Sequence, residues 1–115
     1  MKKISAIETN DIGKDHVTQL LDTFEHHGPN GTHQCLAFDV MGPSSTVMFE
    51  NLPKELRGTG SQTAHEKRGR YPLWMAKSLL RQVLLGLDFL HRNDIIHGDV
   101  QPGNVLFSVK ALECL

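Results

Sequence analysis

The feature that most constrains this chain is a polar stretch near the C-terminus, His97-Gly98-Asp99-Val100-Gln101-Pro102-Gly103-Asn104. An apolar pair, Ile95-Ile96, precedes it, and an apolar triplet, Val105-Leu106-Phe107, follows it. We therefore expect a loop between two short strands. Pro102 fixes its own φ angle and Gly103 permits backbone angles that other residues resist, so both favour a single loop conformation.

The side chains of this loop suit phosphate chemistry. Asp99 supplies a carboxylate that can accept the proton of an attacking hydroxyl, and Asn104 supplies an amide oxygen that can bind Mg²⁺. An ordinary turn between two strands uses the same residue types, so the stretch alone leaves both interpretations open.

Length and composition limit the remaining choices. The 115 residues suffice for one small domain, and a net charge of -1 gives no support to a nucleic-acid or membrane-surface partner. No apolar run is long enough to span a membrane, and Cys35 and Cys114 lack metal or redox spacing, so we expect an intracellular protein of the cytoplasm or nucleus. His26, His27 and His33 lack zinc-site spacing and are interpreted as surface residues.

Turn signals predict a β-hairpin in the first half of the chain. Residues 1–14 are typical of a helix end and a loop, and strands are expected at 16–24 and 34–41. Gly-Pro and Asn-Gly pairs between them, at residues 28–31, favour a tight turn. Ser44 or Ser45 can then cap a short helix over 46–52, which Pro53 ends.

The longest predicted element is a helix over residues 73–92, after an exposed charged loop over 53–71. One face carries apolar residues at helical spacing, namely Ala76, Leu79, Leu80, Val83, Leu87 and Leu90. These 115 residues can cover that face only in part, so the sequence predicts self-association or a hydrophobic partner there.

Taken in order, these elements resemble the protein kinases, and among them the fungal serine/arginine-rich-protein-specific kinases. The segments that carry the resemblance are His16–Asp22, Gly28–Leu36, Phe38–Gly42, Lys77–Leu84, Gly86–His91 and the H-x-D-x-x-x-x-N pattern of 97–104. The resemblance implies an α+β, partial kinase fold. Residues 1–41 would form the last N-lobe hairpin and the hinge, and 42–115 the first C-lobe helices, the catalytic loop and the next strand.

The resemblance also implies roles for individual residues, with ATP and Mg²⁺ as cofactors. Asp99 corresponds to the catalytic aspartate, Gln101 to a neighbouring catalytic position and Asn104 to the metal ligand. The adenine pocket would consist of Phe38, the backbone of Asp39 and Met41, and Leu106. The implied substrate is serine or threonine in a protein, such as an arginine/serine-repeat protein.

The sequence departs from the family pattern in three respects. Gly98 stands where many kinases have Arg, and Gln101 where most have Lys. The 115 residues contain no Gly-rich phosphate loop with its Lys and Glu, and no Asp after Asp99 that could begin a D-F-G motif. We therefore expect a kinase fragment that is inactive alone.

Two other functions stay open on the sequence. One is a non-catalytic, kinase-derived protein that binds a partner through its long helix. The other is a small-molecule phosphotransferase of the aminoglycoside-kinase type, which shares the His-Gly-Asp start of the loop.

Overall fold

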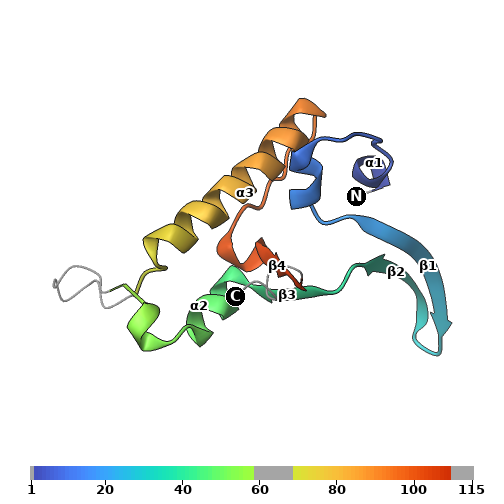
Figure 1. The fold of residues 1–115 in the computed structure, drawn as a ribbon. Helices are drawn as coiled ribbons and strands as arrows, with labels where there is room; N and C mark the ends of the chain where they lie inside the picture. The colour runs from blue at the N-terminus through green and yellow to red at the C-terminus, as the bar shows by residue number, and fades with distance from the viewer. Residues whose placement is uncertain (1, 59–68, 110–115) are drawn as a thin grey trace. The chain divides into compact units, whose positions relative to one another are not determined.

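The computed structural model describes residues 2–58 and 69–109 (Figure 1). Most of the predicted exposed loop over 53–71 lies outside these residues, and so does Cys114. The elements in order are α1 (Lys2–Ser5), η1 (Ile12–His16), β1 (Leu20–Gly28), β2 (Gly31–Phe38), β3 (Met41–Ser44), α2 (Ser45–Asn51), η2 (Lys54–Leu56), α3 (Leu73–Arg92), η3 (Pro102–Asn104) and β4 (Leu106–Ser108), where η marks a 3₁₀ helix.

The chain divides into two compact units, which are described separately. The first consists of Met1–Val40 and Leu85–Ile96, and the second of Met41–Leu84 and His97–Leu115. The second unit begins at Met41, and the end of α3 belongs to the first unit. The division of residues 1–41 and 42–115 between two kinase lobes stays a prediction.

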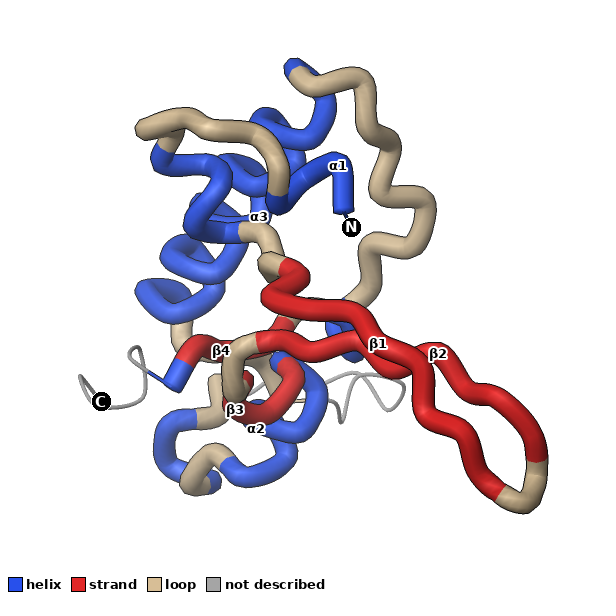
Figure 2. Tube along the Cα trace, turned by 90° about the vertical axis from the view of Figure 1, so that its right-hand side faces the viewer, coloured by secondary structure: helices blue, strands red, loops and turns tan. Residues whose placement is uncertain are grey.

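The predicted hairpin is confirmed as the antiparallel pair β1–β2, a two-stranded ribbon with a tight turn (Figure 2). Gly28 pairs with Gly31, whose φ of 115° lies in the left-handed region that glycine favours. Both predicted strands were placed wrongly along the chain. β1 begins at Leu20 rather than His16, because Asp11 caps η1 by accepting a hydrogen bond from the Gly13 N–H at 2.8 Å. β2 ends at Phe38 rather than Met41.

The core of the first unit packs a residue from the start of the chain against the end of α3. Ile4, Phe89 and Leu90 are buried together, and Ile7, Val17 and Ile95 pack against them. The 3₁₀ helix η1 lies close to the C-terminal half of α3 at two glycines. A Cβ atom at Gly13 would lie 2.5 Å from the Leu85 carbonyl oxygen, and one at Gly86 would lie 2.9 Å from the His16 carbonyl oxygen. Only glycine permits this approach.

Gly13→Ala should therefore destabilise the chain by about 1–3 kcal/mol, because the added methyl group overlaps the backbone of α3 and the Phe89 Cβ. Urea unfolding followed by circular dichroism measures the difference. Gly103→Ala is the matched control, since a Cβ there meets nothing within 4 Å. Equal unfolding midpoints for the two variants would contradict the close packing of η1 on α3.

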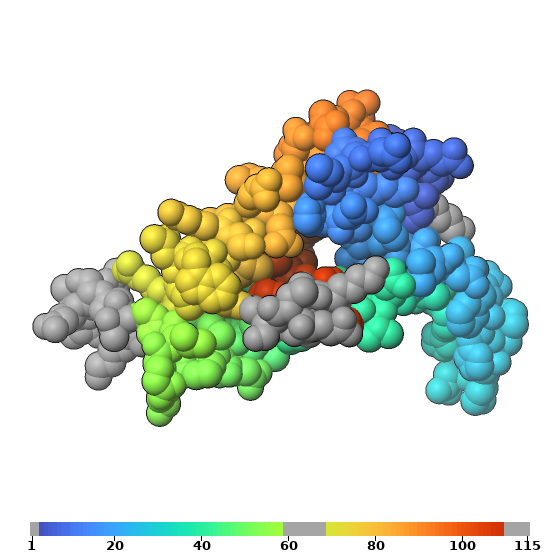
Figure 3. Space-filling view, in the orientation of Figure 1, coloured from blue at the N-terminus to red at the C-terminus, as the bar shows by residue number. Residues whose placement is uncertain are grey.

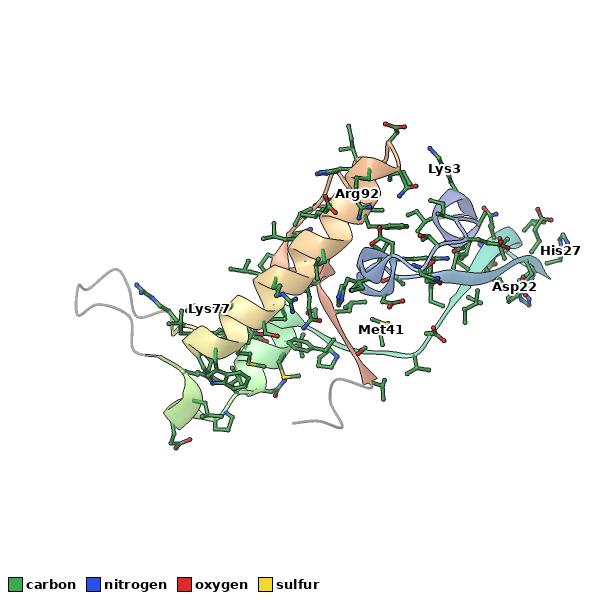
Figure 4. All side chains as sticks on the ribbon, turned by 45° about the horizontal axis from the view of Figure 1, so that its top comes forward. Lys3, Asp22, His27, Met41, Lys77 and Arg92 are labelled. Carbon is green, nitrogen blue, oxygen red and sulfur yellow. The ribbon has the colours of Figure 1, made fainter. Side chains whose placement is uncertain are left out.

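An ionic network also links η1 to the end of α3. The Arg92 guanidinium lies 2.6 Å from the Asp11 carboxylate and 2.8 Å from that of Asp88 (Arg92 is labelled in Figure 4). The hydrogen bond from the Gly13 N–H and then that from Arg92 hold the pKa of Asp11 below its ordinary value of 3.8.

This lowered pKa gives a pH-dependent contribution to stability. The ionised Asp11 stabilises the fold above the ordinary pKa of 3.8, and the contribution disappears as the pH falls through the lower pKa of the folded state. Asp11→Asn keeps a good helix cap but loses the charge. We expect the difference in urea midpoint between wild type and Asp11→Asn to be constant above about pH 5 and to shrink below about pH 4. A difference that does not change with pH would contradict the ionic link.

In the second unit, β3 and β4 form a short antiparallel pair, in which Met41 opposes Ser108 and Ser44 opposes Leu106. Ser44 is the cap of α2, as the sequence predicted for Ser44 or Ser45, and its hydroxyl accepts a hydrogen bond from the Val47 N–H. The other expected flanking strand, Ile95-Ile96, is wrong, because these residues follow the α3 end without regular structure.

The predicted long helix is confirmed with the same limits, 73 and 92. It ends where Asp94 adopts a left-handed backbone with φ 57° and the Ile95 N–H bonds the Leu90 carbonyl. Part of the apolar face is left uncovered, as the sequence predicts: Leu80 is 62% exposed. Together with Leu73 and Leu84 it lies on an exposed apolar stripe. No described helix is long and apolar enough to cross a membrane.

Candidate functional site

The polar stretch predicted from the sequence, His97–Asn104, lies within the second unit, between α3 and β4 in the chain. His97–Gln101 have no regular structure, and η3 (Pro102–Asn104) follows. The special backbone conformation expected at Gly103 occurs at Gly98 instead, whose φ is 79°. Gly103 has no positive φ, since it lies inside η3. A side chain at position 98 would strain this conformation, which explains the glycine there.

Asp99 is the centre of a hydrogen-bond network within the loop. Its two carboxylate oxygens accept from the Gln101 Nε2 at 3.1 and 3.2 Å, and Oδ2 also accepts from the Asn104 Nδ2 at 2.8 Å. The Asn104 Nδ2 donates to the Asp99 carbonyl as well, at 3.0 Å. The Asp99 N–H donates to the His97 Nδ1 at 3.2 Å. The structure thus brings together three side chains that the sequence singled out.

This arrangement leaves the right atoms available for catalysis with a metal ion. Both bonds that orient the Asn104 side chain use its Nδ2, so its Oδ1 remains as the oxygen that can meet a cation. Asp99 is solvent-exposed, so a substrate hydroxyl can reach its carboxylate. The residues present therefore fit Mg²⁺ and a proton acceptor side by side.

Gln101 contributes in a way that the sequence did not indicate. The resemblance implied only that its neutral amide occupies a catalytic position where most kinases have Lys. In the structure the amide donates to Asp99 and so orients the carboxylate.

Ser45 is a residue of the site that sequence reasoning missed. It is buried, and its hydroxyl donates to the Pro102 carbonyl at 2.7 Å, while its N–H donates to the Val105 carbonyl at 2.7 Å. The sequence marked Ser44 and Ser45 as alternative helix caps. A hydrogen bond across 57 positions leaves no local pattern that could have revealed it.

Two aromatic residues lie next to Ser45: Tyr71, from the segment just before α3, and Phe49, from α2. The Tyr71 hydroxyl donates to the Ser45 carbonyl, and the Tyr71 and Phe49 rings lie 5.3 Å apart between centroids. The Arg57 guanidinium lies 5.4 Å from the Phe49 centroid. Burial raises the pKa of Tyr71 above its ordinary 10.0, so this hydroxyl remains a donor at neutral pH.

The residues of the predicted adenine pocket are divided between the two units, which are described separately. Met41 and Leu106 lie on the paired strands β3 and β4 of the second unit (Met41 is labelled in Figure 4). Phe38 ends β2, and Asp39 follows it in the first unit, each solvent-exposed. Among residues 2–58 and 69–109, no group of three or more His, Cys, Asp or Glu side chains could hold a metal ion. The histidines of the hairpin, His26, His27 and His33, are exposed, as expected.

Comparison with known proteins shows the family of the chain. Residues 4–113 match the protein kinase domain family. The chain is 36% identical to protein kinase dsk1 of Schizosaccharomyces pombe over 110 residues, which are 95% of this chain and 18% of that protein. It is 37% identical to serine/threonine-protein kinase SKY1 of Saccharomyces cerevisiae over 103 residues, 89% of this chain and 12% of the relative.

A human relative, SRSF protein kinase 3, is 33% identical over 110 residues, 95% of this chain and 17% of that protein. The chain thus spans less than a fifth of the length of each of these relatives. The H-x-D-x-x-x-x-N loop, the hydrogen-bonded Asp99–Asn104 pair and the match over 4–113 agree: the chain belongs to the protein kinase domain family and is similar to its SR-protein-kinase members.

Proposed function

We propose that His97–Asn104 is the phosphoryl-transfer loop of a serine/threonine protein kinase of the SR-protein-kinase type. The observation that carries this proposal is the Asn104 side chain, which bonds both the carbonyl and the carboxylate of Asp99. These two bonds set a proton acceptor beside a metal-binding oxygen. The kinase relatives are our reason for preferring a protein substrate to a small molecule.

In this mechanism the chain's own residues orient the acceptor and the metal. The Asp99 carboxylate accepts the proton of a serine or threonine hydroxyl as that oxygen attacks the γ-phosphorus of ATP, and ADP leaves. The Gln101 amide keeps the carboxylate in place. Asn104 presents Oδ1 to Mg²⁺, which, when bound, neutralises charge on the phosphates.

From the family resemblance we propose the adenine contacts residue by residue. The backbone of Asp39 and Met41 would offer carbonyl and N–H groups to the adenine edge, and Phe38 and Leu106 would supply apolar contacts. The exposure of Leu106, at 42%, leaves its side chain accessible to a ligand. The name SRSF protein kinase 3 supports an arginine/serine-repeat protein as the substrate.

A chimera tests the proposal. Residues 4–113 would replace the matching residues of human SRSF protein kinase 3, which supplies the remainder of a kinase domain. With labelled ATP and an arginine/serine-repeat peptide, we expect Mg²⁺-dependent transfer. A folded chimera that binds ATP but transfers no phosphate would contradict the proposed function.

A second candidate function is partner binding through α3. Between residues 73 and 84 of this helix, Leu73, Leu80 and Leu84 are 70%, 62% and 64% exposed and share one face at spacings of seven and four residues. α3 is yellow to orange in Figure 3, and Lys77 projects from the same part of the helix in Figure 4. Such a stripe favours association with another apolar surface.

We therefore expect the isolated chain to self-associate at micromolar concentration or to bind a hydrophobic dye. Leu80→Glu and Leu84→Glu should weaken both effects, because a charge on the stripe cannot be buried without cost. Arg81→Glu is the matched control, since it changes a neighbouring exposed residue outside the stripe. Sedimentation at several concentrations provides the measurement. A monomer that binds no dye would rule out this function.

A further inference from the structure

The buried hydroxyl of Ser45 is a group to which neither the kinase motif nor the comparisons give a role. Ser45 is 7% exposed and begins α2, which packs near η3 in the same unit. A helix that needs only a cap already has one in Ser44. The Ser45 side chain is therefore free for another contact.

Ser45 forms hydrogen bonds on both sides of Asn104, to the two ends of the turn η3. The Ser45 hydroxyl binds the carbonyl of Pro102, the first residue of η3, and the Ser45 N–H binds the carbonyl of Val105, just after η3. Asn104 lies between these two anchored carbonyls. Its own N–H bonds the Gln101 carbonyl at 2.9 Å, and the Val105 N–H bonds Pro102 at 3.3 Å. A 3₁₀ turn of three residues has few internal bonds, so outside anchors determine its stability.

Ser45 is itself fixed by a further hydrogen bond, from Tyr71. Its carbonyl accepts a hydrogen bond from the Tyr71 hydroxyl, and the Tyr71 ring packs on Phe49 of α2. Residues from α2, from the segment before α3 and from the polar loop therefore converge on one buried serine. Without the hydroxyl, the Pro102 carbonyl would keep only the longer bond from Val105.

We propose that Ser45 is a positioning residue for the phosphoryl-transfer loop. Its hydroxyl fixes η3, so that the Asn104 Nδ2 stays on Asp99 and Oδ1 stays turned toward the metal ion. This proposal rests on the proposed kinase function for what is positioned. The anchoring of η3 by Ser45 can be measured without any catalysis.

Hydrogen exchange of the full 115-residue chain, read by mass spectrometry at the Asn104 and Val105 amides, measures the anchoring. Ser45→Ala should accelerate exchange there about three- to tenfold, the effect of losing one buried neutral hydrogen bond. Ser45→Thr keeps the hydroxyl and should restore slow exchange. Ser44→Ala is the matched control, which should accelerate the Val47 amide and leave η3 unchanged.

Tyr71→Phe keeps the ring and removes only the hydroxyl behind Ser45, so it should give a smaller acceleration at the same amides. If Ser45→Ala accelerates exchange throughout the chain because the variant unfolds, Tyr71→Phe still tests whether Ser45 anchors η3. The proposal is overturned if Asn104 and Val105 are unprotected in wild type. It is also overturned if neither Ser45→Ala nor Tyr71→Phe changes their exchange, or if Ser44→Ala changes it as much.

Turnover in the chimera gives the second readout. Ser45→Ala should lower kcat several-fold with the KM for the peptide unchanged, and Ser45→Thr should restore kcat. Faster exchange without any change in kcat would overturn the positioning role. If wild-type chimera transfers no phosphate while Ser45→Ala still accelerates exchange at η3, the kinase function fails and the anchoring stands.

Discussion

Asp99→Asn in the chimera is expected to lower kcat by about 10²–10⁴-fold, the usual contribution of a positioned general base. Asparagine has the same size and can keep the contact with Gln101, so the loop should retain its shape. The affinity for ATP should then stay within a few-fold of wild type, because no residue of the adenine pocket changes. Steady-state kinetics and a nucleotide-binding titration separate the two quantities.

Asn104→Ala provides the contrast in the same chimera. It removes the metal-binding oxygen together with both bonds to Asp99. Turnover and Mg²⁺-dependent nucleotide binding should therefore fall together, whereas Asp99→Asn affects turnover alone. Identical kinetic profiles for the two variants would contradict the assignment of separate roles.

The isolated 115-residue chain should transfer no measurable phosphate to an arginine/serine-repeat peptide and should bind adenine nucleotide weakly at most, around Met41. Its sequence contains no Gly-rich phosphate loop and no second metal-binding aspartate after Asp99. Loss of one such electrostatic contact typically costs about 3–4 kcal/mol, or about 10²–10³ in rate, and here several are absent together. Gln101 adds no positive charge that could replace them.

A transfer assay with labelled ATP measures this, with the Asp99→Asn chain as the background. Transfer above that background would mean that other groups, including those of a bound partner, supply the phosphate contacts. That result would refute the predicted inactivity while strengthening the assignment of Asp99.

Local signals in the sequence predicted most of the secondary structure. The turn at residues 28–31 and the limits of α3 follow from glycine, proline and apolar spacing, which act over a few residues. The strand limits of the hairpin were wrong, since alternation around His16 did not reveal the 3₁₀ helix that Asp11 caps. The sequence predicts that the apolar face of α3 is only partly covered, and Leu80 is exposed, but the breadth of the stripe does not show in advance which of its edges is covered.

The candidate site was predicted where a motif defines it and missed where a tertiary contact does. Asp99 and Asn104 lie five positions apart, and the structure joins them by hydrogen bonds. Ser45 is far from η3 in sequence, and its residue type is common at helix starts, so only the folded chain reveals its contact with Pro102. The unusual backbone conformation expected at Gly103 occurs at Gly98 for a similar reason, because the residue type alone does not show which glycine has a positive φ.

The most direct test of the assignment compares two aspartate-to-asparagine variants of the chimera. Asp99→Asn changes the carboxylate of the polar loop, and Asp15→Asn changes an exposed carboxylate of η1. Phosphate transfer to an arginine/serine-repeat peptide is measured for both at saturating ATP and Mg²⁺. The account predicts that Asp15→Asn keeps nearly full turnover, while Asp99→Asn loses at least about 10²-fold. Equal turnover of the two variants would show that the loop at 97–104 is not the phosphoryl-transfer site.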